Sequence, residues 1–148
     1  MVEIAFYHLT RSRLERELPK LLARTLDAGQ RAFVLCRNQA SVAALDKALW
    51  DAPEPAWLPH GTAADGDAEL QPIWLGMEAT PPNGAKYLFL VDGAVPPSFG
   101  AFDRIFDLFD GNDENAVAAA RLRWKNTRDA GHTLTYWQQG PHRWQKKA

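Results

Sequence analysis

The sequence has a single cysteine, very little net charge and no apolar run of the length that a membrane span requires. Cys36 has no second cysteine with which to form an internal disulfide, and its place at the end of AFVLC predicts a buried core thiol rather than a nucleophile. A membrane-spanning helix needs about 20 consecutive apolar residues. The first residues, MVEIAFYHL, also lack the basic leader of a signal peptide. We therefore expect a cytoplasmic protein without a membrane segment.

The loop that follows the first apolar run contains no glycine. Residues 8–12 read HLTRS, which excludes a phosphate-binding P-loop and the GxGxxG turn of dinucleotide-binding folds at this place. The histidines have no close histidine or cysteine partner at ligand spacing. The acidic turn at residues 107–114 is not a calcium loop, because Asn115 and Arg121 stand where glycine and glutamate are needed. We predict no cofactor, no metal site and no catalytic residues.

The periodicity of the apolar residues predicts one α/β domain. A chain of 148 residues is long enough for a single domain and too short for two of ordinary size. Short apolar runs at residues 3–8 and 31–36 alternate with helical spacing at residues 13–26 and 41–49. This alternation predicts a parallel sheet with covering helices. Further strands are expected at residues 73–75, 86–91, 104–109 and 132–138, and a further helix at residues 113–130.

The sequence also predicts how the second helix begins and where the domain ends. Ser41 is the expected N-cap of the second helix, with Ala43 and Ala44 among its inward-facing residues. The domain is expected to occupy residues 1–138. Residues 139–148 carry basic side chains but no periodicity, so we expect a tail that frays.

Positive charge is concentrated toward the C-terminus. The formal net charge is −1, yet residues 113–148 contain seven Lys or Arg against three Asp or Glu. The remainder is therefore acidic, which argues against a protein that coats nucleic acid with an all-round basic surface. The asymmetry favours an anionic partner at one end of the molecule.

One helical face in this basic region combines cations with apolar side chains. On a helix, the spacing places these residues on one side: Val117, Arg121, Trp124, Lys125 and Arg128. Val117 and Trp124 would form an apolar floor, and the three cations at its edge could hold carboxylates or phosphates. The same cations would also complement the dipole at a helix C-terminus, and Trp124 would suit a core position. The pattern alone leaves both interpretations open.

A second candidate surface is the aromatic and proline-rich segment of residues 50–60, WDAPEPAWLPH. Its two tryptophans and three prolines follow a helix and form a rigid stretch that could expose aromatic area to a partner. The candidate contact residues are Trp50, Trp57, Pro59 and His60. The alternative is that both indole rings fold back against the edge of the sheet, and the sequence does not decide between the two.

Several segments, taken in order, resemble the chi subunit of bacterial DNA polymerase III holoenzyme, a part of the clamp-loader assembly. They run over residues 4–138, and their order and spacing carry the resemblance because no single segment is specific. The segments are Phe6 with Tyr7, residues 45–50 (LDKALW), residues 57–60 (WLPH), residues 103–109 (DRIFDLF), residues 118–125 (AAARLRWK), and Ala130 with Gly131.

The resemblance implies a three-layer α/β/α fold with a mainly parallel sheet, similar to a nucleotide-binding domain without the phosphate loop. It also implies a noncatalytic adaptor that links the replicase to single-stranded-DNA-binding protein (SSB), so that DNA is contacted mainly indirectly. The disordered SSB C-terminus ends in acidic residues, an apolar tip and a terminal carboxylate. Arg121, Lys125 and Arg128 would receive the carboxylates, while Val117 and Trp124 would pack the apolar end.

The resemblance implies a second partner, the psi subunit, which tethers chi to the clamp loader. Trp50 and Trp57 fall where the family uses aromatic contact residues, and a helicase-like replisome protein could use the same patch. Two other functions remain open. A direct single-strand-binding module would stack a base on Trp124 and track phosphates with the neighbouring cations. A nucleotide-dependent enzyme would use Asp92 or His60 as a site residue.

Overall fold

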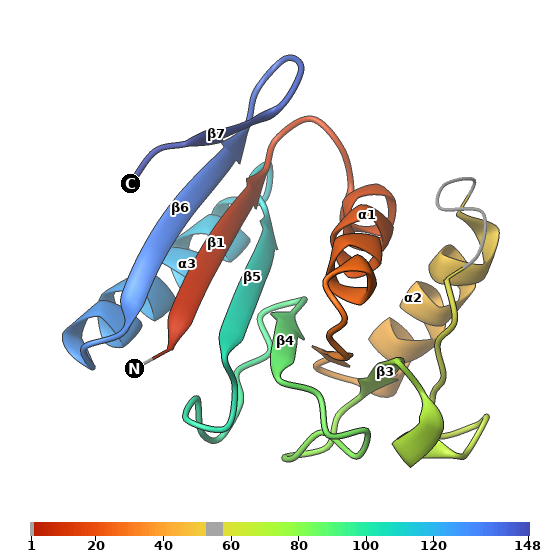
Figure 1. The fold of residues 1–148 in the computed structure, drawn as a ribbon. Helices are drawn as coiled ribbons and strands as arrows, with labels where there is room; N and C mark the ends of the chain where they lie inside the picture. The colour runs from red at the N-terminus through yellow and green to blue at the C-terminus, as the bar shows by residue number, and fades with distance from the viewer. Residues whose placement is uncertain (1, 53–57) are drawn as a thin grey trace.

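The structure of the chain is a computed structural model, and it describes residues 2–52 and 58–148. Within these ranges the chain forms one seven-stranded sheet with three α-helices and one short 3-10 turn (Figure 1). The helices are α1 (Leu14–Asp27), α2 (Gln39–Asp51) and α3 (Glu114–Asp129), and the 3-10 turn is at Ala68–Leu70. The strands are β1 (Glu3–Leu9), β2 (Ala32–Leu35), β3 (Ile73–Gly76), β4 (Tyr87–Leu90), β5 (Arg104–Asp110), β6 (Thr133–Gln139) and β7 (Trp144–Lys146).

The sheet is mainly parallel, as the sequence predicts. Its strand order is β3-β2-β4-β5-β1-β6-β7, and only the last pair, β6 with β7, is antiparallel. The first strand lies inside the sheet, where Ile4 is in register with Ile105 on β5 and with Leu134 on β6. β5 and β6 therefore lie on either side of the N-terminal strand, although both are far from it in the sequence.

Helices cover both faces of this sheet. Figure 1 shows α1 and α2 on one side and α3 on the other. Successive residues of a strand point to opposite faces, so β1 contributes to two apolar cores. Ala5 and Leu9 pack in the core beneath α1 and α2, whereas Ile4 and Phe6 pack in the core beneath α3. The expected three-layer α/β/α architecture is confirmed.

Cys36 directly follows β2 and is buried. Burial raises the pKa of its thiol to about 12, with smaller effects in the same direction from the carboxylates of Asp92 and Glu78. A thiol with so high a pKa stays protonated at neutral pH and is a poor nucleophile. The prediction of a core thiol is confirmed.

The start of α2 differs from the expectation. Asn38 is the N-cap, because its side-chain oxygen accepts a hydrogen bond from the backbone N–H of Ser41 at 2.9 Å. The Ser41 hydroxyl instead donates to Asp92 at 2.7 Å. Ala43 and Ala44 are exposed rather than inward-facing, because the larger apolar residues of the helix occupy its inner side.

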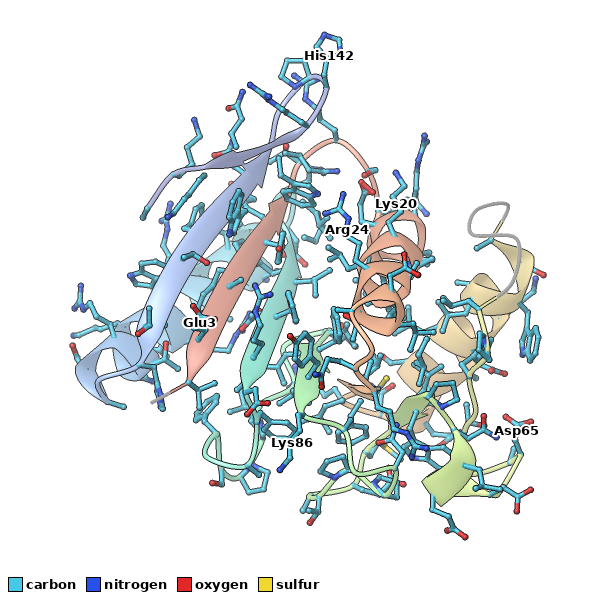
Figure 2. All side chains as sticks on the ribbon, in the orientation of Figure 1. Glu3, Lys20, Arg24, Asp65, Lys86 and His142 are labelled. Atoms are coloured by element: carbon cyan, nitrogen blue, oxygen red, sulfur yellow. The ribbon has the colours of Figure 1, made fainter. Side chains whose placement is uncertain are left out.

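The C-terminal residues differ from the expectation of a frayed tail. After a turn that carries His142 at its tip in Figure 2, the chain returns as β7 and pairs with β6. The ring of Trp144 packs edge-on against Tyr7, with ring centroids 4.9 Å apart. A three-residue strand is too short to show a period in the sequence, and one of its contacts is with Tyr7 on β1, at the other end of the chain.

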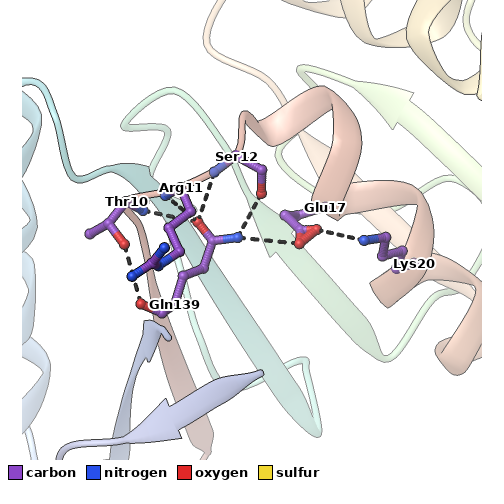
Figure 3. A network of polar contacts seen from close by, with 6 residues as sticks. All are labelled: Thr10, Arg11, Ser12, Glu17, Lys20 and Gln139. Carbon is purple, nitrogen blue, oxygen red and sulfur yellow. Dashed lines mark hydrogen bonds and ion pairs between the residues drawn. The ribbon is translucent and has the colours of Figure 1, made fainter. Parts of the chain in front are cut away.

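Gln139 anchors this hairpin to the loop after β1 (Figure 3). Its side-chain oxygen accepts hydrogen bonds from three consecutive backbone N–H groups, those of Thr10 at 2.9 Å, Arg11 at 2.9 Å and Ser12 at 3.1 Å. Its side-chain nitrogen donates to the Ser12 hydroxyl at 2.6 Å and to Glu17 at 3.2 Å. Consecutive N–H groups after a first strand are what a phosphate loop offers to its ligand. Here the chain's own glutamine occupies them.

We expect Gln139→Ala to loosen the β6–β7 hairpin, because the three N–H groups lose their acceptor. The free energy of unfolding should fall by about 1–2 kcal/mol, and amide hydrogen exchange in β7 should speed up relative to β1. Chemical denaturation and hydrogen exchange measure the two effects. Gln138→Ala is the matched control, since the Gln138 side chain makes no hydrogen bond to the residues described. Equal stability and equal exchange in the two variants would contradict this role of Gln139.

Candidate functional site

The start of α3 is held by Asp113, whose side chain accepts hydrogen bonds from the backbone of Asn115 at 2.9 Å and of Ala116 at 3.3 Å. This cap satisfies N–H groups that the first helical turn leaves unpaired. From this start the helical period turns Val117 and Trp124 toward the sheet, where both are half-buried against the core. The inner face of the helix therefore presents an apolar surface near its exposed cations.

A pocket of about 390 Å³ lies beside this face. Its walls come from α3, β5, β6 and the chain after β7. The lining residues are Phe109, Val117, Ala120, Arg121, Trp124, Tyr136, Lys147 and Ala148. Three of the five residues predicted for tail binding thus meet at one cavity. The sequence interpretation missed Phe109, Tyr136 and Lys147, which no local pattern connects with α3.

The floor of the pocket is aromatic. The Trp124 ring meets Phe6 edge-on, with centroids 5.2 Å apart, and meets Tyr136 in the same manner at 5.8 Å. The two sequence interpretations of Trp124 are therefore compatible, because its ring packs against the core and also lines the cavity. Rings held on two sides form a rigid apolar surface, which lowers the entropy cost of packing a ligand on it.

Arg121 is exposed at the edge of this pocket and forms no ion pair with the residues described. Its charge nevertheless acts on two neighbours. Burial lowers the pKa of His8, a hydrogen bond with the Gly111 backbone opposes that shift, and the Arg121 guanidinium adds to the lowering. Burial raises the pKa of Tyr136, and Arg121 counteracts it. Both shifts agree with the position of the Arg121 side chain at the edge of the pocket, close to His8 and Tyr136.

His8 supports the pocket from behind. Its Nδ1 lies 2.5 Å from the Tyr136 hydroxyl, and its ring stacks at an angle on Phe109 with centroids 5.0 Å apart. A side chain at Gly111 would not fit, because a Cβ there would lie 2.1 Å from the His8 ring. Glycine in the turn after β5 therefore allows the close approach that orients Tyr136.

Arg123 faces away from the pocket and forms a buried ion pair. Its guanidinium donates two hydrogen bonds to Asp107 on β5, at 2.7 Å and 2.9 Å. Bidentate geometry holds both partners in one orientation. The pair attaches α3 to the sheet and thereby sets which side chains of the helix meet the pocket.

Lys125 and Arg128 do not line the pocket. Both are exposed on α3, and Arg128 lies 3.4 Å from the carboxylate of its neighbour Asp129. An exposed pair of this kind contributes little energy and leaves the cation available. The two residues extend the positive charge from Arg121 toward the C-terminal end of the helix.

The second predicted surface is only partly described. Trp50 is 58% exposed at the end of α2, whereas Trp57 lies outside the described residues and Pro59 is half-buried. The His60 ring is buried beneath Trp50, with ring centroids 4.4 Å apart. His60 Nδ1 donates to the Leu58 carbonyl at 2.7 Å, and Nε2 lies 3.0 Å from an Asp46 oxygen. His60 thus supports Trp50 from below instead of presenting its own ring.

A nucleotide-dependent enzyme would use the crevice at the carboxyl ends of the strands. An open crevice of about 890 Å³ lies there, and Asp92 is one of its residues. Asp92 has a φ angle of 57°. Its carboxylate accepts a hydrogen bond from the Ser41 hydroxyl and therefore already has a partner within the chain. Among the described residues, no group of three or more His, Cys, Asp or Glu side chains could hold a metal ion.

Comparison with known proteins identifies the family. Residues 1–135 match the family model described as DNA polymerase III chi subunit, HolC. The chain belongs to the DNA polymerase III chi subunit family. It is 24% identical over 127 residues to the DNA polymerase III subunit chi of Escherichia coli (strain K12), which covers 83% of this chain and 84% of the relative. It is 30% identical over 107 residues to the subunit of the same name from Pseudomonas aeruginosa (strain PAO1), which covers 72% of each.

Membership of the chi family confirms the resemblance seen in the sequence. A chi subunit is a noncatalytic accessory protein of DNA replication, in agreement with the prediction that the chain is not an enzyme by itself. The chi-family match ends at residue 135, before the β6–β7 hairpin turns. In the part of the chain that the structure describes, no helix combines the length and apolar character needed to cross a bilayer.

Arg121→Ala should raise the pKa of both His8 and Tyr136, because the cation that lowers each of them is removed. Stability should also depend on His8. Its folded-state pKa is lowered, so its contribution is fully present above the unfolded value of about 6.5 and is lost as the pH falls through the folded value. Proton NMR titration of the His8 ring measures the pKa, with Lys125→Ala as the control. Unchanged pKa values in Arg121→Ala would contradict the placement of its charge.

Proposed function

We propose that this chi-family protein is a noncatalytic adaptor of the bacterial DNA replicase, and that the pocket beside α3 binds the acidic C-terminal tail of SSB. The observation that carries the proposal is an aromatic pocket with an exposed arginine at its edge that forms no ion pair with the residues described. A ligand with an apolar tip and a nearby carboxylate satisfies both features at once. Through this contact the protein would link SSB to the clamp loader, in the cytoplasm beside replicating DNA.

The tip of the tail would enter the pocket against Val117 and Trp124, while its terminal carboxylate meets Arg121. The preceding acidic residues would follow α3 toward Lys125 and Arg128. Arg121 and Arg128 are seven positions apart on α3, which is about 10 Å along the helix axis. An extended peptide covers that distance with about three residues. The spacing therefore suits a short acidic run next to an apolar end.

Affinity for such a tail should be moderate and sensitive to salt. The cations are exposed, so their attraction for carboxylates is screened at physiological ionic strength. A short peptide with one apolar anchor is expected to bind with a dissociation constant on the order of micromolar. Several tails on one SSB-coated strand would raise the effective affinity by multivalency. A contact of this strength allows the replicase to bind and release SSB repeatedly.

We propose that the surface around Trp50 binds the second partner, the psi subunit or another replisome protein such as a helicase. Trp50 is 58% exposed, and the buried His60 ring below it holds the indole in place. Exposed, rigid tryptophans are common anchors in protein interfaces. Pro59 belongs to the same proposed surface, and Trp57, which lies outside the described residues, is proposed as a further contact residue. It lies at the end of α2, on the opposite side of the sheet from α3, so the two partners could bind together (Figure 1).

The geometry favours a peptide over bare single-stranded DNA. Base stacking needs an exposed aromatic face, whereas Trp124 is half-buried and bordered by Phe6 and Tyr136. A nucleotide-dependent reaction is also disfavoured, because Gln139 occupies the N–H groups after β1 that would otherwise receive a phosphate.

A fluorescence-anisotropy titration tests the tail proposal. The probe is a labelled peptide that ends in acidic residues, an apolar residue and a free carboxylate. We expect Arg121→Ala to weaken binding about tenfold or more, which corresponds to about 1.4 kcal/mol, and a peptide without the apolar residue to bind as weakly. Trp50→Ala is the control and should bind the peptide normally, because it lies outside the pocket.

The tail proposal would be contradicted if the intact peptide did not bind the protein at low salt. A parallel titration with a bare oligonucleotide then distinguishes the remaining function. Oligonucleotide binding that Arg121→Ala removes would replace the adaptor proposal with direct recognition of single-stranded nucleic acid.

A further inference from the structure

The chain after β7 forms one wall of the α3 pocket. Lys147 and Ala148 both line the cavity. Their backbone is attached to β6, because the Lys147 N–H donates to the Tyr136 carbonyl at 2.7 Å and the Tyr136 N–H donates to a main-chain oxygen of Ala148 at 3.3 Å. This wall lies outside residues 1–135, the part of the chain that matches the chi family model. Family membership therefore assigns nothing to it.

Strand alternation determines which lysine of this segment meets the pocket. Lys146 is in register with Trp137, and Trp144 with Gln139, so these four residues share the face of the sheet that α1 covers. Lys147 points to the other face, which it shares with Tyr136 and α3. Two adjacent lysines of equal charge thus lie on opposite sides of the sheet.

Lys147 is exposed and forms no ion pair or side-chain hydrogen bond with the residues that the structure describes. Its aliphatic stem can cover part of the Tyr136 ring while its ammonium group stays at the mouth of the cavity. The pocket consequently has two available cations that come from different elements, Arg121 from the helix and Lys147 from the sheet edge.

We propose that the β6–β7 hairpin completes the peptide pocket and that Lys147 binds a second carboxylate of the ligand, together with Arg121. This inference rests on the proposed binding of an acidic tail and names a further residue that determines its specificity. Two cations on separate elements select a peptide end that carries a terminal carboxylate and an acidic side chain close together. A ligand with one negative charge leaves one cation unpaired and binds less tightly.

Gln139 is a positioning residue for Lys147. Its hydrogen bonds to the loop after β1 hold the last residue of β6, and the Trp144 contact with Tyr7 holds the returning strand. A hairpin attached at both places keeps the lysine beside the cavity, which reduces the ordering cost when the peptide binds.

The test is the labelled acidic peptide titrated against wild-type protein, Lys147→Ala and Lys146→Ala at low and physiological salt. We expect Lys147→Ala to bind about three- to fivefold more weakly and with a smaller salt dependence. Lys146→Ala removes the same charge from the opposite face and should change binding by less than about 1.5-fold. Lys147→Arg should retain binding, which shows that the loss in Lys147→Ala does not come from misfolding.

A second peptide, with its last acidic side chain replaced by the corresponding amide, locates the interaction. It should bind wild-type protein and Lys147→Ala almost equally, because the carboxylate that Lys147 contacts is gone. The Lys147 inference is overturned if Lys147→Ala binds as wild type while Arg121→Ala does not, or if both lysine variants weaken binding to the same extent. Failure of the peptide to bind wild-type protein at low salt would overturn the tail proposal itself, and the Lys147 inference with it.

Discussion

The geometry of the pocket depends on the buried ion pair between Asp107 on β5 and Arg123 on α3. Asp107 is 2% exposed, and the two hydrogen bonds from the guanidinium satisfy both of its oxygens. Removing one partner would leave a buried charge, at a cost of several kcal/mol. The pair therefore fixes the rotation of α3. Residues of a helix turn by about 100° each, so with Arg123 held on Asp107, Arg121 lies on the same side of α3 as Val117 and Trp124, at the edge of the pocket.

The β6–β7 hairpin is the second element on which the pocket depends. β6 supplies Tyr136, which joins the Trp124 ring to the His8 side chain on β1, so the aromatic floor is continuous across three elements. The hairpin then returns along the outer edge of β6 and brings Lys147 to the same cavity. Gln139 ties this arrangement to the loop after β1. The N–H groups that a phosphate loop would offer to its ligand thus serve here to hold the hairpin beside the α3 pocket.

Helices and strands whose apolar residues recur at regular spacing could be predicted from the sequence. The part of the candidate site that lies on α3 could be predicted in the same way. Regular spacing was enough to place Val117, Arg121 and Trp124 on one side of α3. It did not identify Phe109, Tyr136 or Lys147, because these residues meet the helix only through the order of strands in the sheet. The alternation in HTLTYWQ separates Tyr136 from Trp137, but which of them faces α3 depends on the neighbouring strands. The burial of His60 and the polar contacts of Gln139 likewise arise from residues distant in the sequence, which no local pattern records.

The most direct test of the account is chemical-shift mapping of the acidic peptide on isotope-labelled protein. The shifted backbone and indole resonances are expected to cluster along α3 from Val117 to Arg128, on Phe109 and Tyr136, and on the hairpin at Lys147. Resonances of Trp50 and of the crevice around Asp92 should stay unchanged. Shifts concentrated at Trp50 or Asp92, with α3 and the hairpin unaffected, would contradict the central claim that this pocket receives the tail.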